Sequence, residues 1–488
     1  MKLKDLLEGI SYELIQGDLE REITAVAYDS RKVEKGALFV CLKGFASDGH
    51  QYIGQAVQAG AAALLVEDVP SELPDAAVVR VADSRKALAA LSAAWFGYPA
   101  RRMTMIGLTG TKGKTTTAHM VKGILEAAGY KVGMIGTLGA FVGAEKIPTK
   151  NTTPESYELH ALFARMLVAG CQCVVMEVSS QGLKLDRTAG IHFDYAAFLN
   201  LSPDHIGPGE HADFQDYLAC KSLLFRQCGT AVVNLDDPHC QEVTAAAPVR
   251  YTLSLKGEAD FMARNIRNIW EPGLLGVAFD LSGRFGTHLT LNMPGDFNAE
   301  NALAAAGIAW SMGIGPQVIQ SALRKVQVKG RTQVLPSPPS GAAFLIDYAH
   351  NALSMESLLS MLKSYRPGRL ICLFGGGGNR AKQRRYDMGE IAGKYADLTI
   401  ITLDNPRFED PESINADIIR GLEVHHGAYQ VIMDRAEAIR YLLDHCVKGD
   451  IAALIGKGHE EYQEIRGVKH HFSEEQVVFD YLNHLNQS

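Results

Sequence analysis

The chain has 488 residues, of which 47% are hydrophobic and 21% are charged. At about 150 residues per domain, this length predicts about three domains with hydrophobic cores, and it excludes a disordered chain or a small disulfide-stapled scaffold. The 48 Lys and Arg residues and 55 Asp and Glu residues leave a net charge of −7, so no overall basic field indicates non-specific binding of nucleic acid.

The N-terminus and the cysteines indicate a protein of the reducing cytoplasm. No run approaches the roughly 20 apolar residues of a membrane span, and residues 1–8 turn acidic where a signal peptide would become apolar. The eight cysteines show no metal-ligand pattern, and Cys171 and Cys173 lie beside an apolar segment. We therefore expect a cytoplasmic protein with neither a membrane nor a nucleic acid as partner, and with buried, reduced thiols.

In chain order, short apolar segments and turns first predict a small α/β unit. Strands are expected near residues 24–28, 36–42 and 62–66, and helices at 54–61 and 85–96. From Met103 onward, apolar strands, glycine turns and long helices alternate, which is typical of a parallel, doubly wound sheet. These strands are expected at 103–108, 132–135, 173–178, 196–201 and 231–235.

A second boundary is expected where proline and serine cluster at 336–341. The alternation then restarts, with strands predicted at 343–348, 370–374, 398–403, 430–433 and 451–455. We therefore predict an α/β protein of three domains: a small N-terminal domain over residues 1–98, a central domain over 99–333 with a doubly wound, mostly parallel sheet, and a Rossmann-like domain over 334–488.

The turn after the strand 103–108 is the most informative motif. It reads Thr109-Gly-Thr-Lys-Gly-Lys-Thr-Thr-Thr117 and leads directly into a predicted helix. Its glycines allow backbone N–H groups to face an anion, Lys114 adds a positive charge, and Thr115 offers a hydroxyl for Mg²⁺. Leu108 stands where the strict P-loop pattern has its first glycine. We nevertheless predict a nucleoside triphosphate site formed by Gly110, Thr111, Lys112, Gly113, Lys114, Thr115 and Thr116.

Polar residues follow two later strands of the same predicted sheet. Open parallel sheets bind ligands at the carboxyl ends of their strands. Glu177 ends the strand 173–178 among apolar neighbours, where a carboxylate is unfavourable unless it meets a cation, so we predict a metal ligand. His205 follows the next strand, and its position alone distinguishes it from an ordinary structural histidine.

Six motifs occur in a fixed order along the chain. They are Gly110-Thr-Lys-Gly-Lys-Thr-Thr116, Glu177-Val-Ser-Ser180, Asp204-His205, Asn298 with Asn301-Ala-Leu-Ala-Ala305, Gly330-Arg331 and Asp347-Tyr-Ala-His350. In this order the chain resembles the Mur ligase family over all three domains. The resemblance implies an ATP-dependent amide ligase that adds an amino acid to a UDP-linked muramyl peptide of peptidoglycan through an acyl phosphate.

The resemblance also implies roles for residues around the nucleotide. ATP and Mg²⁺ are the expected cofactors, with Lys114, Lys221 and His205 as catalytic residues. The expected metal ligands are Thr115, Glu177, His205 and Lys221. Lys221 matches a lysine that is carbamylated by CO₂, which would replace a cation by an anion; without the resemblance it reads as an exposed helix lysine. Further ATP contacts are implied at Asn298, Arg331, Asp347 and His350.

Residues 28–40 and 48–53 resemble the UDP-binding domain of the members that add the third amino acid. Ser30 is the implied UDP contact. The implied contacts to the muramyl peptide are Asn151, Thr152, Thr153, Ser179 and Arg187. Without the resemblance, residues 151–154 read as a capped turn before a helix at 155–168. Leu185 stands where many members have a glutamine that contacts the sugar peptide.

The last domain carries the implied amino-acid site. Asp404-Asn-Pro-Arg407, Gly456-Lys-Gly-His-Glu460 and Arg380 resemble the members that add meso-diaminopimelate. A guanidinium fork can hold the distal carboxylate that lysine lacks. The implied contacts are Arg380, Asp404, Asn405, Pro406, Arg407, Gly456 and Glu460.

Two alternatives remain open at this point. Residues 204–211 are similar to lysine-adding relatives, so the same reaction with L-lysine is the closest alternative. A P-loop ATPase that acts as a switch or motor is an alternative of another class, but it leaves residues 1–98 unexplained. We expect a monomer whose partners are small molecules: ATP, a UDP-MurNAc dipeptide and a diamino acid.

Overall fold

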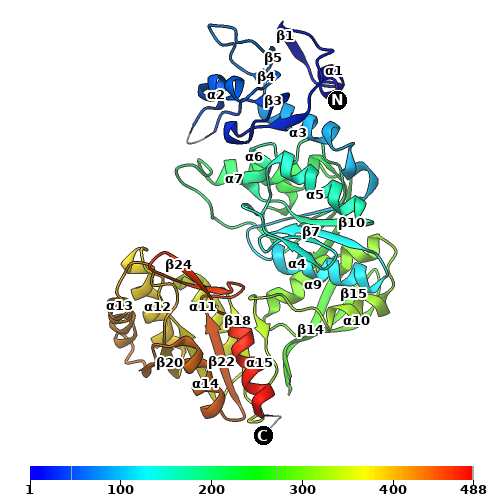
Figure 1. The fold of residues 1–488 in the computed structure, drawn as a ribbon. Coiled ribbons are helices and arrows are strands. Elements are labelled where there is room, and N and C mark those ends of the chain that lie inside the picture. Colours follow the sequence, from blue (N-terminus) through cyan, green and yellow to red (C-terminus); the bar gives the residue numbers. More distant parts are fainter. Residues whose placement is uncertain (45–46, 272, 486–488) are drawn as a thin grey trace. The chain divides into compact units, whose positions relative to one another are not determined.

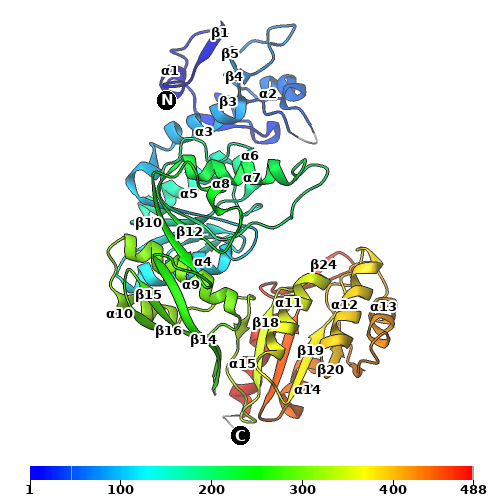
Figure 2. The ribbon, with the colours of Figure 1, turned by 180° about the vertical axis from the view of Figure 1, so that it is seen from behind.

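The computed structural model describes residues 1–44, 47–271 and 273–485. Two compact units are formed, one by Met1–Phe261 with Ala304–Ile314 and the other by Met262–Leu303 with Gly315–Ser488. Figure 1 shows their elements coloured along the sequence, and Figure 2 shows the same ribbon from behind. Within the described residues, no helix combines the length and the apolar character needed to cross a bilayer.

The first unit begins with a five-stranded sheet in the order β1-β5-β4-β3-β2. Its strands β2 to β5 are parallel and β1 is antiparallel to β5. The packing of Leu38 and Leu65 towards Leu88 places α3 on one face, while Phe39 and Leu64 pack with Ala56 of α2 on the other. The elements are α1 (Leu3–Leu6), β1 (Tyr12–Gln16), β2 (Ala25–Ala27), η1 (Ser30–Lys32), β3 (Ala37–Val40), η2 (Gly49–Tyr52), α2 (Ile53–Gln58), β4 (Ala63–Val66), β5 (Ala77–Val81), α3 (Ser84–Trp95) and η3 (Pro99–Arg102).

A second sheet in this unit has the order β13-β12-β11-β6-β10-β7-β8-β9. The strands from β13 to β7 are parallel, and β8 and β9 are antiparallel. Its strands are β6 (Thr104–Thr109), β7 (Val132–Gly136), β8 (Gly139–Val142), β9 (Glu145–Ile147), β10 (Cys173–Glu177), β11 (Phe193–Phe198), β12 (Cys228–Asn234) and β13 (Val249–Ser254). Its helices are α4 (Lys114–Ala127), α5 (Ser156–Val168), α6 (Ser180–Lys184), α7 (Phe214–Ser222), η4 (Leu223–Arg226) and α8 (Cys240–Val243).

The strand order determines where this sheet can bind a ligand. The chain leaves β6 for β7 on one side, fills the gap with β10, and then crosses to β11 on the other side. The carboxyl end of β6 is therefore the topological switch point, where open α/β sheets bind their ligands.

The second unit contains a meander of β14 (Phe261–Glu271), β15 (Leu274–Gly283) and β16 (Thr287–Leu291), followed by α9 (Asp296–Ser311), which continues into the first unit, and α10 (Pro316–Leu323). Strands β15 and β16 are antiparallel. A six-stranded sheet follows in the order β17-β18-β22-β19-β20-β21, in which all strands except β17 are parallel. The fold is thus α/β, as predicted, but its sheets are mixed.

Helices cover both faces of the six-stranded sheet (Figures 1 and 2). Leu359, Met388 and Ile418 place α11, α12 and α13 on one face, and Ile439 and Val478 place α14 and α15 on the other. The elements are β17 (Gln333–Val334), β18 (Ala343–Asp347), α11 (Ala352–Lys363), β19 (Arg369–Phe374), α12 (Lys382–Tyr395), β20 (Leu398–Ile401), α13 (Pro411–Glu423), β21 (Tyr429–Val431), α14 (Arg435–His445), β22 (Asp450–Ile455), β23 (Tyr462–Ile465), β24 (Val468–His471) and α15 (Glu474–Leu485).

Local patterns predicted most of these strands to within a few residues, but they missed several short or solvent-facing ones. The missed strands include β1, β5, β8, β9 and the meander β14 to β16. All eight cysteines lie in the described part of the chain and are buried free thiols, which confirms that prediction.

Candidate active site

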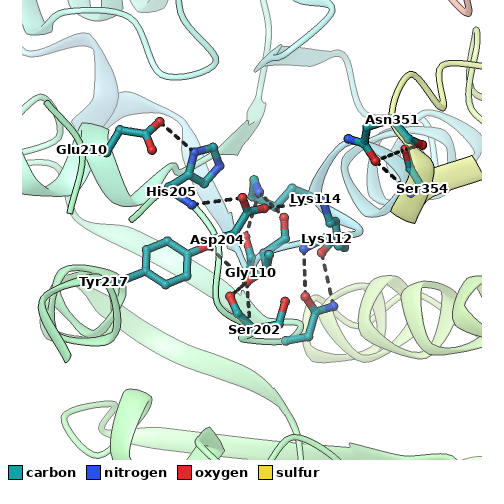
Figure 3. Close-up of polar contacts among 12 residues, drawn as sticks. Gly110, Lys112, Lys114, Ser202, Asp204, His205, Glu210, Tyr217, Asn351 and Ser354 are labelled. Atoms are coloured by element: carbon teal, nitrogen blue, oxygen red, sulfur yellow. Dashed lines mark hydrogen bonds and ion pairs between the residues drawn. The ribbon is translucent and has the colours of Figure 1, made fainter. Parts of the chain in front are cut away.

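The loop between β6 and α4 has the geometry of an anion site. Gly113 is the N-cap of α4 with φ of +87°, a left-handed conformation that disfavours any side chain, and the helix continues for 14 residues. The backbone N–H of Thr111 donates to the Asn200 carbonyl (2.9 Å), and that of Lys112 donates to Asn200 Oδ1 (2.8 Å). The loop after β11 therefore holds the phosphate loop through hydrogen bonds (Figure 3). The start of α4 presents its N–H groups at the switch point.

Glu177 lies beside this loop at the end of β10 and is only 2% exposed. Its carboxylate accepts hydrogen bonds from Thr115 Oγ1 (3.0 Å), from the backbone N–H of Thr137 (2.9 Å) and from Thr137 Oγ1 (3.1 Å). These three donors are uncharged. A buried carboxylate and a helix-terminal hydroxyl in contact are hard oxygen ligands of the kind that Mg²⁺ prefers, so the donor set fits the predicted metal.

Two lysines converge on one carbonyl of the phosphate loop. Lys114 Nζ donates to the carbonyls of Gly110 (2.8 Å) and Thr111 (3.1 Å), and Lys221 Nζ donates to the Gly110 carbonyl (3.0 Å). The expectation from helix pattern alone that Lys221 is exposed is wrong, because α7 turns it inward and leaves it 1% exposed. Burial, followed by the neighbouring charge of Lys114, lowers the pKa of Lys221 well below its ordinary value.

Tyr217 lies between His205 and Lys221, two of the predicted metal ligands. Its hydroxyl lies 3.1 Å from Thr111 Oγ1, and the Lys221 ammonium lies over its ring at 4.6 Å. The His205 ring centre is 6.3 Å from that of Tyr217, and its Nδ1 lies 3.3 Å from Glu210 (Figure 3). Sequence reasoning missed Tyr217, although its position four residues before Lys221 places both on one helical face.

Most of the predicted contacts to the muramyl peptide lie next to Glu177. Thr153 Oγ1 donates to the Glu177 carbonyl (2.9 Å) and accepts from the Ser179 backbone N–H (3.0 Å). Arg187 Nη1 donates to the Thr153 carbonyl (2.9 Å), and Thr152 Oγ1 lies 3.1 Å from Thr137 Oγ1. These side chains therefore form one group around the end of β10.

The capped-turn interpretation of residues 151–154 is wrong. Helix α5 begins at Ser156, its N-cap is Glu155, and no side chain caps it. Asn151 is exposed.

Ser30 lies in η1, between β2 and β3, where its hydroxyl donates to Gln55 Oε1 (3.0 Å). Leu185 is the C-cap of α6, two residues before Arg187.

In the second unit, three of the predicted ATP contacts surround Tyr348. Asp347 accepts from the backbone N–H groups of Thr332 and Ala349 (both 2.7 Å), and burial raises its pKa. The Arg331 guanidinium lies 5.2 Å from the Tyr348 ring centre, and the His350 ring lies 4.8 Å from it. Asn298 lies instead in α9, where it is buried and donates to the Pro294 carbonyl (2.8 Å).

The same unit contains a cavity of about 340 Å³ at the carboxyl ends of β19, β20 and β22. It is lined by six of the seven predicted amino-acid contacts, namely Arg380, Asp404, Asn405, Arg407, Gly456 and Glu460. The seventh, Pro406, approaches Gly378 so closely that a Cβ there would lie 2.7 Å from the Pro406 carbonyl carbon. Sequence reasoning missed Arg384, which also lines the cavity and whose pKa is lowered by burial and by Arg380.

Hydrogen bonds connect the loop after β20 to the loop after β22 at this cavity. Lys457 is fully buried and donates to Asp404 Oδ1 and Asn405 Oδ1 (both 3.2 Å), and Asn405 Nδ2 donates to Glu460 Oε2 (3.0 Å). Burial raises the pKa of Glu460. Guanidinium and carboxylate groups thus face one cavity, which suits a zwitterionic ligand with several charges.

Comparison with known proteins identifies the family. The model of the Mur ligase family, catalytic domain, matches residues 22–96, that of the Mur ligase middle domain matches 108–309, and that of the Mur ligase, glutamate ligase domain, matches 330–458. The chain belongs to the Mur ligase family. It is therefore an ATP-dependent ligase, and Mur ligases use ATP with Mg²⁺.

Similar proteins cover the whole chain. A UDP-N-acetylmuramoyl-L-alanyl-D-glutamate--2,6-diaminopimelate ligase of Clostridium perfringens is 39% identical, and one of Caldanaerobacter subterraneus is 41% identical; each alignment covers 99% of this chain and 99% of the relative. A solved structure of a ligase with the same name has a TM-score of 0.74 and 28% identity, and covers 100% of both chains. MurF of Acinetobacter baumannii, with 22% identity and a TM-score of 0.62 over 99% of this chain and 98% of its own, shares the Mur ligase fold.

Proposed function

We propose that this Mur ligase joins meso-diaminopimelate to UDP-MurNAc-L-Ala-D-Glu, with hydrolysis of ATP to ADP and phosphate, in peptidoglycan precursor synthesis. The names of its full-length relatives support this reaction. The observation that carries the choice of amino acid is the mixed-charge cavity of the second unit. Meso-diaminopimelate has two ammonium and two carboxylate groups, and the cavity offers carboxylates and guanidinium groups for both kinds of charge.

Arg407 is the group that we expect to distinguish the distal carboxylate. Its Nη1 donates to the Gly378 carbonyl (2.7 Å) and its Nε donates to the Glu464 carboxylate (3.2 Å), and these two contacts hold the guanidinium in place. Its Nη2 donates to no residue in the described part of the chain, which leaves that end for a ligand. Lysine lacks the carboxylate that would occupy this position, so bound lysine would leave the Nη2 donor of a partly buried guanidinium without an acceptor.

At the phosphate loop, we propose that Thr115 and Glu177 hold Mg²⁺ and that Lys114 contacts the phosphates of ATP. The metal would supply positive charge against the β- and γ-phosphates as the acyl phosphate forms. Lys114 and the N-terminal N–H groups of α4 then orient the nucleotide towards the acceptor carboxylate. Asp347, Arg331, His350 and Asn298 are the further ATP contacts that we propose.

We also propose that Lys221 is carbamylated and contributes, with His205, to a second Mg²⁺ site. The amine must be uncharged to attack CO₂, and the lowered pKa of this buried side chain favours that form. The new N–C bond forms as the amine loses a proton, which leaves an anionic carbamate. In a wild-type sample with ¹³C-bicarbonate we expect a carbamate carbon resonance that is absent in Lys221→Ala, and its absence from both would contradict the modification.

We propose three domains with boundaries near residues 98 and 333, acting as a cytoplasmic monomer on small-molecule substrates. The cytoplasm supplies the ATP and the UDP-linked substrate. Light scattering of the purified protein at micromolar concentration tests the monomer, since a dimer would double the mass.

The function itself is tested by competition. Purified enzyme receives ATP, UDP-MurNAc-L-Ala-D-Glu and equal amounts of diaminopimelate, lysine and ornithine, and the products are separated by mass. We expect ADP release to require both the nucleotide peptide and an amino acid, with the diaminopimelate product in large excess. A dominant lysine product would establish the alternative substrate, and ATP hydrolysis that ignores both substrates would favour a switch or motor.

A further inference from the structure

A continuous chain of polar contacts crosses the first unit from the loop after β3 to the end of β10. Arg85 of α3 donates through Nη2 to the Lys43 carbonyl (3.3 Å), and its Nη1 lies 3.6 Å from Glu155 Oε2. Glu155 Oε1 lies 2.6 Å from Arg187 Nη2, and Arg187 Nη1 donates to the Thr153 carbonyl (2.9 Å). Glu155 is therefore shared between two guanidinium groups from different elements.

Glu155 occupies a position where its side chain would be expected to cap a helix. It is the N-cap of α5, yet it makes no capping hydrogen bond. Serine, threonine, aspartate and asparagine are preferred there because their short side chains reach the N–H groups of the first turn. The longer glutamate instead directs its carboxylate to Arg85 and Arg187. The side chain thus serves the two arginines rather than the helix.

Arg187 is held in a conformation that leaves one donor for a ligand. Its side chain is only 12% exposed, and its Nε is buried without a hydrogen-bond partner in the described structure. The residue before it, Asp186, has φ of +52°, a left-handed conformation that few non-glycine residues adopt. An unpaired buried guanidinium N–H is unfavourable unless a ligand supplies the acceptor.

We propose that Glu155 is a positioning residue that holds Arg187 for a carboxylate of the acceptor peptide and connects it, through Arg85, to the five-stranded sheet. This inference rests on the proposed function, which supplies an acceptor whose D-glutamyl end carries two carboxylates. Ser30, the proposed UDP contact, lies in η1 between β2 and β3, so this chain of contacts connects the elements that would bind the two ends of one substrate. Removing the Glu155 charge should weaken binding of the peptide end and leave the uridine end unaffected.

Two variants separate this role from helix stability. Glu155→Gln keeps the size of the side chain and removes its charge. Glu155→Asp keeps the charge, withdraws it from the arginines by one methylene, and introduces a good helix cap. A purely structural role predicts that the aspartate variant is as good as wild type. The control is Glu145→Gln, which removes an exposed ion pair (2.9 Å) between Glu145 and Arg165 of the same helix α5.

The experiment measures binding of UDP-MurNAc-L-Ala-D-Glu and of UDP to each protein by calorimetry, together with the melting temperature. We expect both Glu155 variants to bind the dipeptide substrate about tenfold more weakly, to bind UDP within twofold of wild type, and, for Glu155→Asp, to melt no lower than wild type. Wild-type dipeptide affinity in both variants, or equal loss for UDP and dipeptide, would overturn the role of Glu155. Wild-type enzyme that binds the dipeptide no better than UDP would instead refute the proposed acceptor, and the positioning role with it.

Discussion

Replacing Gly136 by alanine should damage the proposed Mg²⁺-ATP site although it replaces none of the residues proposed to hold Mg²⁺-ATP. Gly136 is the last residue of β7, and a Cβ there would lie 2.8 Å from Glu177 Cδ and 3.0 Å from Glu177 Cγ, and closer still to Oε1. The backbone of a central strand cannot easily move, so the Glu177 side chain must. It can move only by giving up its contacts to Thr115 and Thr137.

The expected magnitude follows from those contacts. Glu177 accepts three hydrogen bonds of 2.9 to 3.1 Å in a buried position. A hydrogen bond to a charged group contributes about 1.5 to 3 kcal/mol, so losing the one that aligns Thr115 corresponds to a loss of about tenfold to a hundredfold in Mg²⁺-ATP affinity. The displaced carboxylate should also lower the free energy of unfolding by about 1 to 3 kcal/mol.

The measurements are the Kd of Mg²⁺-ATP by calorimetry and the midpoint of urea unfolding. Gly54→Ala is the matched control, because Gly54 lies inside α2 and a Cβ there meets nothing within 4 Å. It should leave nucleotide binding unchanged and stabilise the helix by up to about 1 kcal/mol. If Gly136→Ala binds Mg²⁺-ATP with the wild-type Kd, Glu177 does not hold the metal together with Thr115.

Three further predictions follow from charged groups. Arg407→Ala should reduce kcat/KM for diaminopimelate about a hundredfold while changing lysine turnover little. The control is Arg440→Ala, since Arg440 is exposed. Equal loss for both amino acids would contradict the proposed role of Arg407 in holding the distal carboxylate. Burial lowers the pKa of His160 from 6.5 to about 4, so the unfolded state binds the proton first and stability falls as pH drops through this range. At about 1.4 kcal/mol per pH unit the loss totals about 3.5 kcal/mol. His160→Leu should abolish that part of the acid sensitivity measured by urea unfolding, whereas parallel curves of stability against pH would contradict it. Arg435→Met should lower the free energy of unfolding by about 3 to 5 kcal/mol, because it removes the cation that pairs with the buried carboxylate of Glu474 (2.7 Å). The double variant with Glu474→Leu should recover much of that stability, and a double variant no more stable than Arg435→Met would refute this account.

Features encoded in a short stretch of chain were predictable, and features that need two distant stretches were not. The phosphate loop and the strand that ends at Glu177 each carry a local signal, namely glycines before a helix and a carboxylate among apolar residues. The closeness of Gly136 to Glu177 depends on β10 lying next to β7, which is a property of strand order. The contacts of Glu155 likewise depend on Arg85 and Arg187, which lie far from it in sequence.

The two fully buried lysines show why burial alone does not reveal a role. Lys457 donates to the carboxylate of Asp404, so the unfavourable burial of its ammonium is offset by an opposite charge. Lys221 donates to the neutral carbonyl of Gly110, which also accepts from the ammonium of Lys114, so a second positive charge there is unfavourable. A lysine in that position is better accommodated as a neutral amine or as an anionic carbamate beside a metal. The electrostatics of this chain therefore favours the neutral amine at Lys221, which is the form that the proposed reaction with CO₂ requires.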